Sequence, residues 1–229
     1  MFNDFLATFS QQLTPQMWGV VATATYETVY ISFASTLLAV VVGVPVGVWT
    51  FLTGKNEILQ NNRTHFVLNT IINIGRSIPF IILLLILLPV TRFIVGTVLG
   101  TTAAIIPVSI GAMPFVARLT ANALMEIPNG LTEAAQAMGA TKWQIVRKFY
   151  LPEALPTLIN GITLTLVTLV GYSAMAGTQG GGGLGSLAIN YGVYRNMPYV
   201  TWVATIIIVL FVMISQKLGD TLAKKVDHR

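Results

Sequence analysis

Long stretches without a charged residue are the feature that most constrains this 229-residue sequence. A helix needs ~20 mostly apolar residues to cross the hydrocarbon core of a bilayer. Residues 28–53, 93–117 and 196–216 are free of charge, and residues 66–91 are interrupted only by Arg76. A fifth stretch, 154–194, is too long for one span. The glycines at 180–183 divide it into a helix near 155–178 and a polar, flexible connection.

This pattern predicts an all-α membrane protein with five transmembrane helices, in a single membrane domain over residues 1–229. A β-barrel would instead show segments of ~10 residues with alternating hydrophobicity. Charged residues make up only 9% of the chain, whereas soluble domains carry about a quarter. This composition excludes a soluble enzyme, a disordered protein and a nucleic-acid-binding domain, so we expect contact with membrane lipids and none with nucleic acid.

The residues that usually carry catalysis or metal binding are scarce. The sequence has no cysteine and only two histidines, which excludes thiolate chemistry and a histidine metal cluster. The only Gly-Lys pair, Gly54-Lys55, lacks the flanking residues of a Walker A loop, with Trp49 and Asn56 in their places. We therefore expect no catalytic residue, no metal and no cofactor on this chain.

The distribution of Lys and Arg predicts how the chain is oriented. With five spans, segments 54–65 and 118–153 and the tail after 216 share one side, and they hold two, four and four basic residues. The opposite side holds only Arg92 and Arg195. Basic residues favour the cytoplasmic side. This predicts an N-terminus outside the cell and a cytoplasmic C-terminus.

The first eighteen residues do not form a span. Apolar residues recur here at helical spacing: Phe2, Phe5, Leu6, Phe9 and Leu13. This pattern predicts a short helix over residues 1–18 that lies at the membrane–water interface on the outer side of the membrane. A helix packed on its own bundle explains the same spacing equally well.

Residues 126–156 depart from the pattern of spans and predict two short helices that turn at a glycine. Asn129 is a suitable N-cap for a helix through Met138, and Gly139 suits the left-handed position after it. Thr141 and Gln144 form a capping box for the second helix. Pro152 is expected to end that helix.

The first of these helices carries a narrow apolar stripe of Leu131, Ala134, Ala135 and Met138, at positions i, i+3, i+4 and i+7. A short helix with small side chains can enter a groove on another protein. An ordinary amphipathic hairpin beneath the bundle is the alternative.

The same region carries a family resemblance. Glu133-Ala134-Ala135, Gly139, Ile145 and Leu151-Pro152 resemble the EAA loop of ABC importer permeases, which places a cytoplasmic coupling loop at 129–150. Further segments resemble the permease subunits of methionine importers: 76–84, 171–177, 182–185 and 191–192. The resemblance covers most of the chain from Arg63 onward.

The resemblance implies a type I ABC importer of the bacterial inner membrane. Two copies of this chain would form the pathway for methionine, the L-isomer and also the D-isomer. ATP and Mg²⁺ would be bound by two separate cytoplasmic ATPase subunits, so this chain would be no enzyme. A lipid-anchored methionine-binding protein outside would deliver the substrate. The alternatives are a permease for another small polar amino acid and a membrane scaffold without a pathway.

Three groups of candidate residues follow. The resemblance assigns ATPase coupling to Glu133, Ala134, Ala135, Gly139, Leu151 and Pro152. Candidates for the pore or gate are Met175, Ser173 and Arg76. Met175 is flexible and has small neighbours, but an ordinary core or lipid-facing Met is the alternative. Arg76 either faces the pathway, or extends to the cytoplasmic headgroups, or precedes a span that begins later than residue 66. Candidates for docking the binding protein are Gln179, Gly182, Tyr191 and Arg195, with a plain flexible loop as the alternative.

Overall fold

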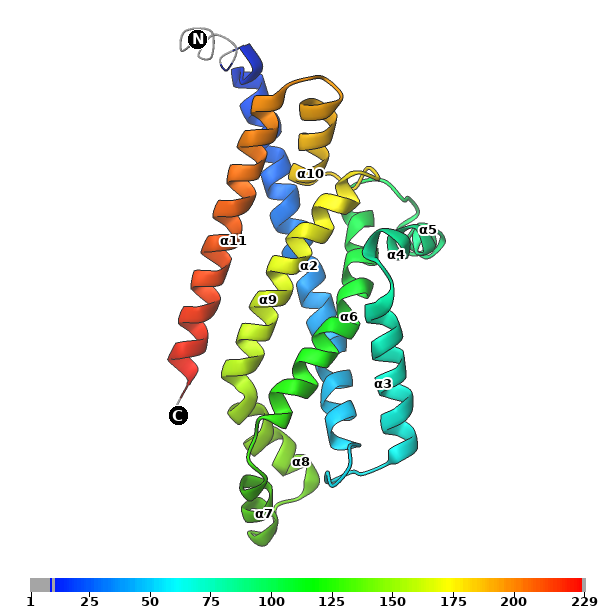
Figure 1. Ribbon diagram of the computed structural model, residues 1–229, viewed down its shortest axis with the longest axis vertical. Helices are drawn as coiled ribbons and strands as arrows, with labels where there is room; N and C mark the ends of the chain where they lie inside the picture. Colours follow the sequence, from blue (N-terminus) through cyan, green and yellow to red (C-terminus); the bar gives the residue numbers. More distant parts are fainter. Residues whose placement is uncertain (1–8, 10, 228–229) are drawn as a thin grey trace. The chain divides into compact units, whose positions relative to one another are not determined.

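The computed structural model describes residue 9 and residues 11–227, and these contain helices and no strand (Figure 1). The long helices are α2 (Pro15–Leu52), α3 (Asn62–Ser77), α6 (Thr101–Met125), α9 (Leu151–Gly177) and α11 (Pro198–Val226). The short ones are α4 (Phe80–Ile86), α5 (Leu88–Val95), α7 (Asn129–Ala137), α8 (Lys142–Ile145) and α10 (Gly183–Leu187), with the π-helical segments η1 (Val146–Tyr150) and η2 (Ala188–Val193).

Four helical segments within the described part of the chain are long and apolar enough to cross a membrane. These are α2, α6, α11 and the continuous run Lys142–Gly177 formed by α8, η1 and α9. The pair α3 and α4 passes the same test only when taken together, and its two helices are bent by 102°. Counting that pair as one broken span gives five. The predicted class, an all-α membrane protein, is confirmed.

The second predicted span, 66–91, is wrong as one continuous helix. It breaks between Ser77 and Phe80, where Ile78 and Pro79 have extended backbone conformations. Proline lacks the N–H that would continue the helix, and it restricts the residue before it to extended geometry. An unbroken apolar interval therefore hides a sharp turn.

Two further boundaries also differ from the predicted ones. The third span begins at Thr101 instead of 93, because Gly96 ends α5 in the left-handed conformation at φ +82°. The first span begins at Pro15 instead of 28, so Glu27 lies inside α2. A carboxylate is tolerated in this helix because it has a hydrogen-bond partner, the Gly183 N–H.

The chain forms two compact units. Unit 1 comprises residues 1–35, 79–109 and 166–215. Its core joins the start of α2 to α10 and to the start of α11, through Leu13, Met17, Val21, Ala24, Leu184, Leu187, Val200 and Ala204. Phe9 packs against this cluster, and its ring makes an edge contact with Tyr199 at 5.8 Å.

Most of the predicted interfacial helix at 1–18 lies outside the described residues. In the described part, Leu13 and Met17 are buried in the core of unit 1, and α2 has already begun at Pro15. This part therefore follows the alternative interpretation, a segment packed on its own protein.

Unit 2 comprises residues 36–78, 110–165 and 216–229. In this unit α2 and α6 are in close contact at Gly47. A Cβ atom added at Gly47 would lie only 2.4 Å from the Ala117 carbonyl oxygen. A second core joins the end of α2 to α6, α7 and the start of the Lys142–Gly177 run; it contains Phe51, Leu52, Ala123, Leu124, Ile127, Ala135, Ile145, Val146, Tyr150, Ala154 and Leu158.

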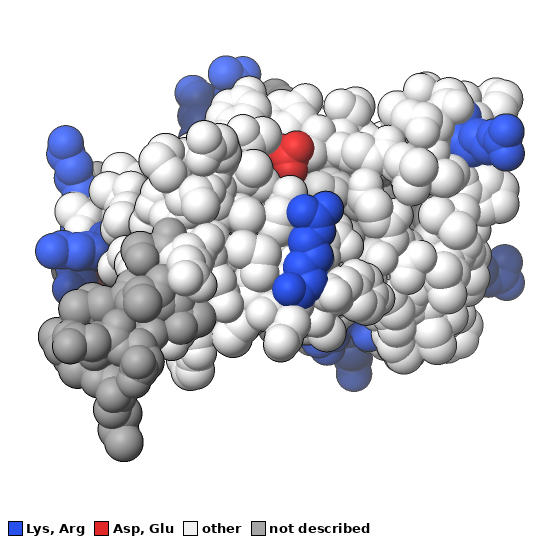
Figure 2. All heavy atoms as spheres, turned by 90° about the horizontal axis from the view of Figure 1, so that it is seen from above, with Lys and Arg blue, Asp and Glu red and all other residues white. Residues whose placement is uncertain are grey.

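Charged side chains are sparse on the surface. Figure 2 shows one face of the molecule, where uncharged residues predominate and Lys and Arg side chains stand at several separate places. This face therefore offers no continuous basic patch of the kind that binds a polyanion.

Candidate functional site

The candidate coupling site is the helix α7 with the turn that follows it. The turn is built as the sequence predicted: Met138 caps the helix, and Gly139 follows at φ +75°. The Ala140 N–H then donates to the Ala135 carbonyl oxygen at 3.0 Å, which closes the helix end. The predicted N-cap is wrong by one residue, because Pro128 occupies that position and Asn129 is the first helical residue.

The predicted apolar stripe of α7 is divided between two environments. Ala135 is fully buried in the core of unit 2, and Leu131 packs against the same cluster. Ala134 and Met138 are exposed. The stripe therefore does not enter a partner as one surface, because half of it holds α7 on its own protein. The hydroxyl groups of Thr132 and Tyr150 add a hydrogen bond of 2.8 Å to this attachment.

The outward surface of α7 combines one acid with small and flexible apolar groups. Glu133 is exposed beside Ala134 and Met138. Together with Gln136 it borders a hollow of about 420 Å³, whose other wall is the turn after α2 with Lys55 and Glu57. Partial burial raises the pKa of the Glu57 carboxyl group. This polar hollow and the exposed face of α7 form one continuous candidate surface for a protein partner.

The second short helix is capped as predicted but does not end as predicted. Thr141 Oγ1 accepts a hydrogen bond from the Gln144 N–H, and Gln144 Oε1 accepts one from the Thr141 N–H. The chain then passes through η1 into α9 without a break, so Pro152 does not stop it. In η1 the Leu151 N–H bonds to the Val146 oxygen, five residues back. Such a π turn changes the hydrogen-bond register just before the proline and lets the helix continue.

The coupling candidates Leu151 and Pro152 are thus the first two residues of α9. Leu151 is half-buried and Pro152 is exposed. They lie in the same unit as α7 and are separated from it by α8 and η1, whose Ile145 and Tyr150 share the core with Ala135.

The three pore or gate candidates occupy different environments. Met175 lies in the last turn of α9 and is 47% exposed in the single chain. Ser173, two residues earlier, is buried and donates its hydroxyl hydrogen to the Val170 oxygen at 2.8 Å. Arg76 is exposed in the last turn of α3, directly before the break at Pro79. A cation at this end of a helix is favoured by the helix dipole.

The docking candidates lie on and after an ordered turn. Gln179 is exposed on the turn after α9, and Gly182 is the N-cap of α10 at φ +76°. The guanidinium group of Arg195 lies 4.3 Å from the centre of the Tyr191 ring, a cation–π contact. The segment predicted as flexible is therefore helical over most of its length, in α10 and η2.

The glycine run packs tightly against its surroundings in unit 1. A Cβ added at Gly181 would lie 2.7 Å from the Ala176 carbonyl oxygen, and one added at Gly182 would lie 2.7 Å from Glu27 Oε2. The glycines thus allow backbone to pack on backbone, and this close packing explains why the segment is ordered.

Sequence reasoning missed the residues that hold this segment. Glu27 Oε2 accepts a hydrogen bond from the Gly183 N–H at 2.7 Å, and Thr28 Oγ1 accepts one from the Leu184 N–H at 2.8 Å. A signal existed, because Glu27 is the only charged residue of α2. An ionisable residue inside a span usually has a partner and a role.

Residues 43–229 match the family described as binding-protein-dependent transport system inner membrane component. The chain belongs to this family. As a member of this permease family it is a multi-pass protein of the inner membrane, in agreement with its long apolar helices.

Relatives within the permease family are close. The chain is 96% identical to a Haemophilus influenzae protein named probable D-methionine transport system permease protein MetI, over 93% of this chain and 100% of the relative. A Pasteurella multocida protein of the same name is 69% identical over 95% of this chain and 100% of the relative. A chain in a solved structure of the MetNI methionine ABC transporter, in inward-facing conformations, superposes with a TM-score of 0.93 at 45% identity; the match covers 94% of this chain and 100% of that one.

Proposed function

We propose that this permease forms, as a homodimer, the pathway of an ATP-driven importer that carries methionine into the cytoplasm. Support for the substrate comes from the relatives, since those at 96% and 69% identity are named for D-methionine transport. The structural neighbour is a methionine ABC transporter. Import of L-methionine by the same pathway is part of the proposal.

The observation that carries the coupling part of this proposal is the construction of α7. Ala135 and the Thr132–Tyr150 hydrogen bond fix this helix to the core of unit 2. Glu133, Ala134 and Met138 remain exposed. A helix that is rigidly joined to membrane-spanning segments and exposed on one face can transmit the motion of a partner, because coupling requires contacts that differ between two states. The proposed partner is one of two cytoplasmic ATPase subunits, which bind the ATP and Mg²⁺.

The proposed orientation follows from the same surface. α7 and the Lys and Arg residues near it lie in the cytoplasm, which puts the N-terminus outside and the C-terminus inside. The segment with Gln179, Gly182, Tyr191 and Arg195 is then extracytoplasmic. It is our candidate surface for a lipid-anchored methionine-binding protein.

Vesicles that hold the permease, its ATPase and the binding protein test the function directly. We expect uptake of labelled L- and D-methionine. This uptake should require ATP on the side of the membrane where the ATPase lies and the binding protein on the opposite side. Absence of methionine uptake, together with ATP-dependent uptake of another labelled small polar amino acid, would assign a different substrate. ATP turnover that is independent of the binding protein, without any uptake, would favour a scaffold.

A further inference from the structure

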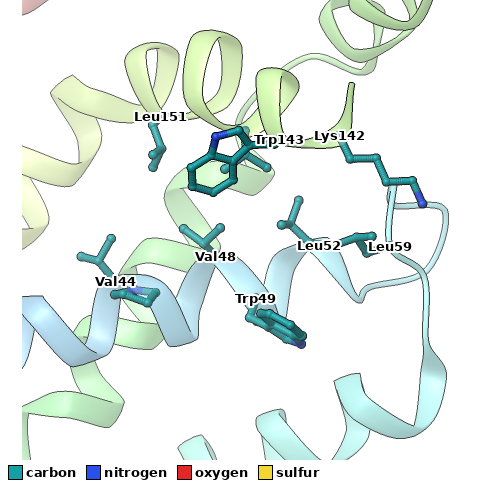
Figure 3. A pocket seen from close by; sticks show the side chains of 10 residues that line it. Val44, Val48, Trp49, Leu52, Leu59, Lys142, Trp143 and Leu151 are labelled. Carbon is teal, nitrogen blue, oxygen red and sulfur yellow. The ribbon is translucent and has the colours of Figure 1, made fainter. Parts of the chain in front are cut away.

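A cavity of about 470 Å³ lies in unit 2 between the second half of α2 and the start of the Lys142–Gly177 run (Figure 3). Val44, Val48 and Leu52 form the α2 side, and Trp143 lies opposite them on α8. Of the ten residues that line the cavity, nine are apolar. The tenth is Lys142. No residue of α7 lines the cavity, and Leu151 is the one coupling candidate that does, so the cavity is distinct from the exposed face of α7.

The cavity lies where two membrane-spanning segments end. Trp49 is in the last turn of α2, which ends at Leu52, and Lys55 is the first charge after it. Lys142 and Trp143 begin the helical run that continues into the other span, whose charge-free part starts at residue 154. Tryptophan is enriched at the boundary between the hydrocarbon core and water, as are lysines that reach toward headgroups. This position therefore faces the acyl chains on one side and the headgroups on the other.

Both tryptophans present apolar surface that the single chain leaves uncovered. Trp49 is 56% exposed and Trp143 is 69% exposed. Apolar surface of this kind is stabilised by an apolar occupant, and the volume of the cavity is within the usual range of about 300–1,000 Å³ for ligand sites.

The single cation at the edge indicates the other half of the occupant. In Figure 3 the Lys142 ammonium group points away from Trp143 and lies at the edge of the cavity, on the side of Leu59. An ammonium group on a flexible stem suits a phosphate as a point charge. The cavity thus pairs one positive charge with an apolar space, which is complementary to one phosphate joined to an acyl chain.

We propose that this cavity binds an anionic phospholipid. An acyl chain of the lipid would lie between α2 and Trp143, and the lipid phosphate would contact the Lys142 ammonium group. The site depends on the chain being a membrane protein and not on which solute it transports. Bound lipid would fill the space between the end of α2 and the segment that leads from Gly139 into α9.

Fluorescence of Trp143 provides the test. In the full-length permease, Trp18, Trp49 and Trp202 are replaced by phenylalanine, and the protein is placed in phosphatidylcholine vesicles. Phosphatidylglycerol with brominated acyl chains is then added in steps, and brominated phosphatidylcholine serves as the comparison lipid. Bromine quenches only a tryptophan that it contacts. We expect saturable quenching by phosphatidylglycerol at a mole fraction at least several-fold lower than by phosphatidylcholine.

Two variants and a control separate the two halves of the site. Lys142→Gln should remove the preference between the two lipids, because only the charge is lost. Val48→Phe should reduce quenching by both lipids, because it fills the cavity. Lys225→Gln, an exposed lysine at the end of α11, should retain the preference of the parent protein.

Equal quenching by both lipids in the parent protein, rising without saturation, would overturn the proposal and indicate ordinary contact with bulk lipid. Absence of quenching would also overturn it. That result, together with crosslinking between cysteines at position 143 of two copies, would identify a second copy of the chain as the occupant.

Discussion

Glu27 and Gly183 are 156 positions apart in the chain, and the Gly183 N–H donates a hydrogen bond of 2.7 Å to the Glu27 carboxylate. The next pair, Leu184 N–H and Thr28 Oγ1, repeats the contact at 2.8 Å. Together they fix the glycine run and α10 to α2. The candidate docking residues on and after the run therefore have a defined position before any partner binds.

Replacing Glu27 should loosen this attachment. A hydrogen bond to a charged group contributes about 1.5–3 kcal/mol, so we expect Glu27→Ala to lower the free energy of unfolding by about that amount. Glu27→Gln keeps an acceptor oxygen and should lose less. Thermal unfolding of the purified permease checks this, with Glu133→Ala, an exposed acid, as control. Equal midpoints for Glu27→Ala and the control would contradict the account.

Gly139 allows a test of backbone geometry alone. It has φ +75°, and a side chain there would meet nothing within 4 Å. A β-branched residue resists this conformation at a cost of about 1–2 kcal/mol, whereas asparagine adopts it more readily. We expect Gly139→Val to lose coupled uptake and Gly139→Asn to retain most of it, at equal abundance in the membrane. Equal uptake by the two variants would show that the turn does not matter.

Met175 and Ser173 make a matched pair for crosslinking in a chain without cysteine. Met175 is 47% exposed in the single chain and Ser173 is buried. If two copies meet at the end of α9, Met175→Cys should crosslink between copies under mild oxidation and Ser173→Cys should not. Equal crosslinking of both, or modification of position 175 only by lipid-soluble probes, would exclude this interface.

Labelling with an impermeant thiol reagent tests the orientation. Lys55 and Lys142 are exposed in unit 2, and Arg195 is exposed in unit 1. Cysteines at 55 and 142 should react only from the cytoplasmic side. Those at 191 and 195 should react only from the other side. Labelling of positions 55 and 195 from one side would overturn the proposed topology.

The features of the structure that depend only on neighbouring residues can be predicted from the sequence. A stretch of ~20 residues without charge indicates a candidate span whatever its neighbours are. The Thr141–Gln144 capping box and the glycine at 139 follow from a few consecutive residues, and both are confirmed.

Features that depend on distant contacts escaped prediction. Counting charges places Glu27 at the border of the first span, because its hydrogen-bond partner is 156 positions away in the sequence. The break at Pro79 lies within an apolar interval, where charge counting gives no signal. Pro152 on its own predicts the end of a helix, but the π turn before it changes the hydrogen-bond register and the helix continues. The burial of Ala135 could not be distinguished from the exposure of Ala134, since spacing shows that two residues share a face and not what covers them.

If α7 couples an ATPase to this pathway, the variant Glu133→Lys should lose transport without losing the fold. Glu133 is exposed beside the apolar surface of α7, so its charge can be reversed without disturbing the core. Unfavourable charge contact at an interface costs several kcal/mol. In vesicles with the complete transporter, we predict normal membrane abundance of the variant, loss of methionine uptake and loss of the stimulation of ATP hydrolysis by the binding protein. Uptake and stimulation equal to those of the parent protein would contradict the account.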